Sequence, residues 1–138
     1  MKCDWKCFLV LIPILVCAVI ILTDKNEPQQ PPISVATEAE RKNYLLSAGW
    51  EGTQISSQNV TIPEIADETY SLYMALQEQQ NLPLSDYMGK DAVICTYALK
   101  NSGLYAELLS VDGILVGVQY YDPLEGITLD KDGKTFTG

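Results

Sequence analysis

The sequence predicts an α+β fold: an N-terminal transmembrane helix, then an antiparallel sheet of about five strands with two helices on one face. The elements are expected in the order α-β-β-α-β-β-β, with a possible terminal hairpin. Three observations support this prediction: an apolar run over residues 8–22, two helix-start signals near residues 37 and 61, and Asp112-Gly113 between two apolar segments.

The apolar run, FLVLIPILVCAVIIL, is preceded by Lys2 and Lys6. Counted from Trp5, which suits a membrane interface, it reaches about 27 Å as a helix, close to a hydrocarbon core of ~30 Å. Basic residues before a span favour a cytoplasmic N-terminus. We therefore expect residues 1–23 to be a cytoplasmic start and single-pass anchor in the cell membrane. A cleaved signal peptide and a buried helix of a soluble protein are the alternatives.

Residues 24–36 are rich in Pro and Gln and predict a linker, and residues 37–138 predict an extracytoplasmic α+β domain. Beyond Leu22, seven basic and seventeen acidic residues give a net charge of −10. This charge disfavours nucleic acid as a partner. The chain has no histidine, the commonest general base, and no recognisable catalytic motif. We expect no enzymatic activity, no cofactor, and a core position for Cys95.

The helices are predicted from their start and stop signals. Thr37 and Glu40 form a capping box for a helix that stops at Gly49. Thr61-Ile62-Pro63-Glu64 repeats the pattern of a cap followed by Pro and predicts a second helix ending at Asn81-Leu82-Pro83. The residues expected on its inner face are Ile65, Thr69, Leu72, Tyr73 and Leu76.

The strands are predicted from apolar patterning and turn residues. Residues 50–55 and 58–62 are expected to form two short strands around Ser56-Ser57, and residues 91–100 a central strand. Residues 104–111 and 114–121 flank Asp112-Gly113, a favoured hairpin turn. An unbroken register pairs Val111 with Ile114, Leu109 with Val116, and Tyr105 with Tyr120. Residues 127–129 and 134–136 predict a terminal hairpin.

Several short motifs recur in a fixed order between Arg41 and Asp122. They are Tyr44-Leu45 with Gly49-Trp50, Val60-x-Ile62-Pro63, Tyr70-x-x-Tyr73-x-x-Leu76-Gln77, Leu84-Ser85-x-Tyr87-x-Gly89-Lys90, Tyr97, and Asp112-Gly113 with Gly117. Together they resemble an uncharacterised bacterial family, a domain of unknown function, of small exported or membrane-anchored proteins of Clostridia-like Gram-positive bacteria. Members of that family often carry Gly-Gly-Asp where this chain has Gly117-Val118-Gln119. The resemblance implies a location and a domain extent but no activity.

The candidate site residues are Tyr105, Glu107 and Tyr120, which the expected register places on one face of the sheet. Tyrosine is common at protein and glycan contacts, so this face is a candidate binding surface. Asp130 and Asp132 are candidate calcium ligands, although Asp and Gly also suit a hairpin turn.

The expected function is a membrane-anchored extracytoplasmic binding module. Its expected partner is an envelope protein, a peptide or a cell-wall component. The alternative is an exported hydrolase or enzyme inhibitor that uses carboxylates or calcium.

Overall fold

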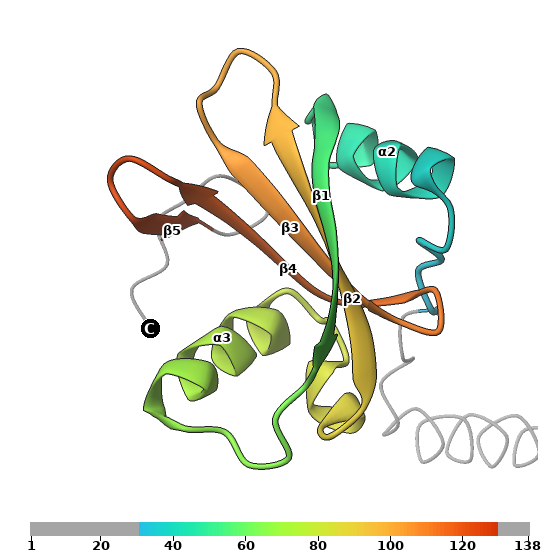
Figure 1. Cartoon of the computed structure of the whole chain (residues 1–138), viewed down its shortest axis with the longest axis vertical. Coiled ribbons are helices and arrows are strands. Elements are labelled where there is room, and N and C mark those ends of the chain that lie inside the picture. The colour runs from blue at the N-terminus through green and yellow to red at the C-terminus, as the bar shows by residue number, and fades with distance from the viewer. Residues whose placement is uncertain (1–30, 130–138) are drawn as a thin grey trace, which may run out of the picture. The chain divides into compact units, whose positions relative to one another are not determined.

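The computed structural model describes residues 31–129, which contain two α-helices, one 3-10 helix and a five-stranded antiparallel sheet (Figure 1). The strands lie in chain order, β1-β2-β3-β4-β5. The α+β class and the five-stranded sheet are thus confirmed. The elements are α2 (Glu38–Ser47), β1 (Gly52–Thr61), α3 (Glu68–Gln79), η1 (Leu84–Tyr87), β2 (Asp91–Leu99), β3 (Tyr105–Val111), β4 (Ile114–Asp122) and β5 (Ile127–Leu129).

The predicted membrane span, residues 8–22, lies outside the described residues. Within residues 31–129, none of the helices has the length and apolar character that crossing a bilayer requires.

Helix α2 begins and ends where its sequence signals predict. The Thr37 hydroxyl accepts a hydrogen bond from the Glu40 backbone N–H at 3.2 Å, and Gly49 ends the helix at a φ of +89°. A glycine tolerates this left-handed backbone, whereas other residues are strained there.

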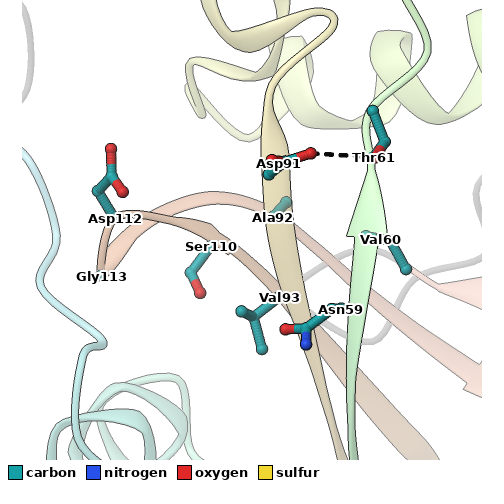
Figure 2. Close-up of a pocket in the computed structure, with 9 residues that line it drawn as sticks. All are labelled: Asn59, Val60, Thr61, Asp91, Ala92, Val93, Ser110, Asp112 and Gly113. Atoms are coloured by element: carbon teal, nitrogen blue, oxygen red, sulfur yellow. Dashed lines mark hydrogen bonds between the residues drawn. The ribbon is translucent and has the colours of Figure 1, made fainter.

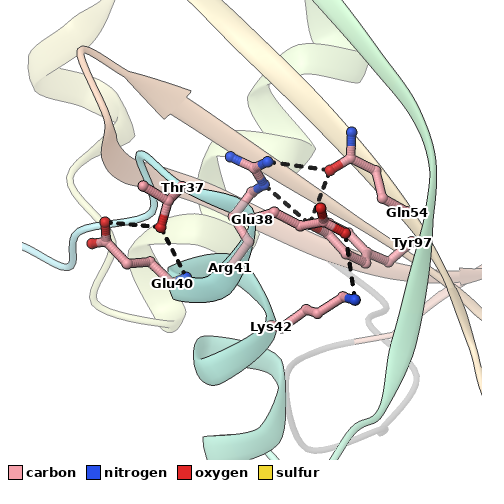
Figure 3. Close-up of polar contacts among 7 residues, drawn as sticks. All are labelled: Thr37, Glu38, Glu40, Arg41, Lys42, Gln54 and Tyr97. Atoms are coloured by element: carbon pink, nitrogen blue, oxygen red, sulfur yellow. Dashed lines mark hydrogen bonds and ion pairs between the residues drawn. The ribbon is translucent and has the colours of Figure 1, made fainter.

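Arg41 fastens α2 to the sheet (Figure 3). Its guanidinium donates hydrogen bonds to the Tyr97 hydroxyl at 3.0 Å, to the Gln54 side chain at 3.2 Å and to the Val35 carbonyl at 3.2 Å. Tyr97 lies on β2 and Gln54 on β1, so one cationic side chain joins a helix to two strands. Leu45, on the inner side of the same helix, is fully buried.

The segment between the helices differs from the prediction in two respects. Ser56-Ser57 does not turn the chain, because β1 is one continuous strand. The pairing of β1 with β2 shifts by one residue at a β-bulge at Ile55. Helix α3 begins at Glu68 rather than near Pro63, because the Asp67 side chain supplies the cap by accepting from the Tyr70 N–H at 2.7 Å. Ile65 therefore lies before the helix, and its side chain is 87% exposed.

The hairpin β3–β4 has the predicted turn but a different register. Asp112 and Gly113 both have positive φ, +49° and +77°, as a type I′ turn requires, and Val111 pairs with Ile114. Beyond that pair, Val116 is an extra residue in β4. Because a bulge shifts the pairing by one residue, Leu109 faces Gly117 and Tyr105 faces Tyr121.

The two helices cover opposite faces of the sheet, so the prediction that both lie on one face is wrong (Figure 1). Successive residues of a strand point to opposite faces. On β2, Cys95 belongs to the same buried cluster as Leu45 of α2, whereas Ile94 packs against the other cluster, as does Tyr73 of α3. The buried α2-side cluster is Val35, Leu45, Cys95, Tyr97, Leu99, Ala106, Leu108, Leu115, Val118 and Tyr120. The buried α3-side cluster is Ile62, Leu84, Ala92, Leu109, Val111 and Val116.

The outer edge of β4 is closed along its length. Near its start, Leu115 N–H donates to the Ile33 carbonyl at 2.9 Å, and Val35 N–H donates to the Gly113 carbonyl at 2.8 Å. At its end, Tyr120–Asp122 pairs with β5.

Between these two segments, the fully buried side chain of Gln77 on α3 takes the place of a strand. Its amide accepts from Val118 N–H at 2.7 Å and donates to the Val118 carbonyl at 2.9 Å. Gln80 donates to the same carbonyl at 3.0 Å.

Candidate functional site

A groove of about 670 Å³ lies at the end of the sheet where β1, β2 and the β3–β4 turn meet (Figure 2). Its polar side chains are Asn59, Thr61, Asp91, Ser110 and Asp112, and Val93 provides an apolar floor. The strand register explains why they converge. Asn59, Val93 and Ser110 are neighbours across three strands, and Thr61 pairs with Asp91 beside them.

The groove lies on the same sheet face as α2, because Val93 packs against the α2-side cluster. Concave sites with a few convergent polar groups are the usual form of ligand sites. This groove is therefore a stronger candidate than a flat sheet face.

Two carboxylates set the electrostatic character of the groove. Asp91 accepts a hydrogen bond from the Thr61 hydroxyl at 3.1 Å, and its side chain is exposed. Asp112 is exposed at the hairpin turn. The ion pairs within residues 31–129 join Lys42 to Glu38 and Lys100 to Glu51, so neither groove aspartate has a described cationic partner. The groove offers acceptors to a ligand that brings positive charge or N–H donors.

The predicted binding residues Tyr105 and Glu107 lie on the α3 face of the sheet. Glu107 is half-buried and accepts a hydrogen bond from the Gln119 side chain at 2.6 Å. Tyr105 meets Tyr121 edge to face, with ring centroids 5.6 Å apart. Burial raises the pKa of Tyr121, and the charge of Glu107 and a hydrogen bond to it add to that rise. Glu107 is therefore already engaged with side chains of its own sheet.

Tyr120, the third predicted residue, does not share that face. It is fully buried on the α2 side, with its ring centroid 5.8 Å from that of Trp50. The expected register placed it opposite Tyr105, and the bulge at Val116 puts Tyr121 there instead. The grouping of Tyr105, Glu107 and Tyr120 on one surface is thus wrong.

The candidate calcium ligands, Asp130 and Asp132, lie outside the described residues. Within residues 31–129, no three or more His, Cys, Asp or Glu side chains gather so that they could hold a metal ion. Cys95 is buried and free, as expected for a core residue.

Comparison with protein-family models, with curated proteins and with solved structures gives no match. The resemblance to the clostridial family stays a prediction.

The groove could not be predicted from the sequence because its residues come from three separate segments of the chain. Asp112 was recognised only as a turn residue. Asn59 and Thr61 alternate with Val60 along one strand, and this alternation indicates a polar face. The residues of β2 that lie beside this face follow only from the pairing of β1 with β2.

Proposed function

We propose that this chain is a membrane-anchored extracytoplasmic binding module and that its partner is a protein or peptide segment carrying Lys or Arg. The anchor is inferred from the apolar run of residues 8–22. The observation that supports the binding role is the groove with Asp91 and Asp112, whose carboxylates have no cationic partner among the described residues.

A basic segment suits this groove for two reasons. Charge-assisted hydrogen bonds from an ammonium or guanidinium group to a carboxylate are stronger than those between neutral groups. The net charge of −9 also attracts cations over a distance comparable to the Debye length. Asn59 and Ser110 add neutral hydrogen-bonding groups that can fix the orientation of a bound backbone.

The test uses the full chain in detergent micelles and a short labelled oligolysine peptide. Asp91→Asn with Asp112→Asn removes both charges and keeps the shape of the side chains. Asn tolerates the positive φ of position 112, so the hairpin turn is preserved. We expect the dissociation constant to rise by roughly tenfold or more, which corresponds to about 1.4 kcal/mol or more.

The control removes two charges elsewhere on the exposed surface, through Asp86→Asn with Glu78→Gln. It has the same net charge as the groove variant. Equal loss of binding in both variants would show that the peptide senses only overall charge, and the groove would be rejected as the site. Co-sedimentation with purified cell-wall polysaccharide that is lost in the groove variant would place the polysaccharide in the groove and reject the peptide partner.

A further inference from the structure

The two sides of the sheet differ in whether their outer backbone groups have hydrogen-bond partners. On one side of the sheet, the outer backbone groups of β4 are paired with residues 33–35, with the Gln77 amide and with the three-residue strand β5. On β1, the opposite edge, no hydrogen bond from another described residue reaches the outer backbone groups of Gly52–Thr61.

An open edge strand is a template for pairing with another strand, and proteins usually protect it with charge, Pro or a bulge. The sequence of β1, GTQISSQNVT, contains no charged residue and no Pro. Its bulge at Ile55 protects only the first part. The part that follows, Ser56–Thr61, keeps a regular register and has the usual length of a strand.

We propose that Ser56–Thr61 is a homodimerisation edge, at which β1 of one chain pairs antiparallel with β1 of a second copy. The two copies of β1 are then related by a two-fold axis, so each chain contributes the same surface to the contact, which is isologous. Its Ser, Thr, Gln and Asn side chains suit this arrangement, since amide and hydroxyl groups can hydrogen-bond across paired strands. The two five-stranded sheets would become one continuous sheet.

The charge distribution favours a second copy over a basic partner at this edge. The chain carries a net charge of −9, yet β1 is neutral, so two copies meet where neither presents a carboxylate on the pairing strand. The remaining repulsion between the two acidic domains is long-range and is screened by salt. Added salt should therefore strengthen the dimer, whereas it would weaken a complex with a cationic partner.

The experiment measures the mass of the full chain in neutral detergent micelles by sedimentation, over a range of protein and salt concentrations. Gln58→Lys places two like charges close together across the proposed axis. Gln79→Lys, on the exposed side of α3, is the matched control, because it makes the same chemical change and the same change in net charge. Melting temperatures of both variants check that the fold is kept.

We expect a concentration-dependent dimer of the unaltered chain that tightens with salt. Gln58→Lys should raise the dimer dissociation constant by roughly tenfold, and Gln79→Lys should leave it unchanged. A chain that stays monomeric throughout, or that dissociates when salt is added, would overturn the proposal. Equal association of the two variants would also overturn it, because association would then come from another part of the chain. Gln58 faces away from the groove, so failure here leaves the groove proposal intact.

Discussion

Gln77 gives the sharpest test of how the β4 edge is held. Its amide both accepts from and donates to Val118, and no part of its side chain is exposed. In Gln77→Leu, the Val118 carbonyl keeps its bond from Gln80, but the Val118 N–H loses its acceptor. An unsatisfied buried donor costs about 1–3 kcal/mol, and the lost hydrogen bonds add to it. We expect the free energy of unfolding to fall by roughly 2–4 kcal/mol.

Gln77→Glu separates hydrogen bonding from packing, because a protonated carboxyl can donate to the Val118 carbonyl and accept from the N–H, as the amide does. Burial disfavours the charged form and raises the folded-state pKa of this carboxyl above its unfolded value of about 4.3. Above that pH the folded state binds more protons than the unfolded state. Relative to wild type, the free energy of unfolding should therefore fall by about 1.4 kcal/mol per pH unit until the folded-state carboxyl also ionises.

The assay is denaturant unfolding of the full chain in detergent, with wild type and variant compared at each pH. Gln79→Glu introduces the same residue on the exposed side of α3 and should show no such pH-dependent difference. If Gln77→Glu lost the same stability at pH values below and above 4.3, or lost none, the amide would not be acting as the edge partner of β4.

Two further predictions concern the contact between α3 and the sheet. An alanine Cβ at Gly117 would lie 2.7 Å from the Tyr73 hydroxyl oxygen, so Gly117→Ala should cost about 1–3 kcal/mol of unfolding free energy. The cost should shrink in a Tyr73→Phe background; equal costs in a double-mutant cycle would contradict the contact. Burial, assisted by Tyr70 and Glu107, raises the pKa of Tyr73. Its phenol therefore ionises first in the unfolded chain, and stability should fall as pH rises above about 10. Tyr73→Phe should remove part of that fall in the free energy of unfolding, measured by urea unfolding at several pH values. If the variant showed the same dependence of stability on pH as the wild type, Tyr73 would not be the group responsible.

The parts of the fold that depend on local chemistry were predictable. Thr37 with Glu40 defines the start of α2, and Asp112-Gly113 defines the hairpin turn, because caps and turns are fixed by a few adjacent residues. The bulge at Val116 was not predictable in this way. No turn or cap residue marks its position, and this single extra residue places Tyr120 in the core instead of on the expected surface.

The sequence of β2 carries a signal for the faces that the two helices cover. Both alternating sets of β2 are apolar, which indicates a strand covered on each side. That pattern already favours one helix per face, since each set needs its own cover. The predicted start of α3 is wrong because Thr61 and Pro63 match the sequence pattern of a helix cap. The residue that caps the helix is Asp67, whose side chain accepts from the Tyr70 N–H.

The pairing of residues 33–35 with β4 has a mechanical consequence. A tether pulling on the chain at Pro32 would transmit its force first to the hydrogen bonds that join Ile33 to Leu115 and Val35 to Gly113. Part of the load would then enter the sheet through β4, and part would reach α2 through the hydrogen bond from Arg41 to the Val35 carbonyl. Gly113 makes this joint possible, because a side chain there would collide with Ala36 at 2.8 Å.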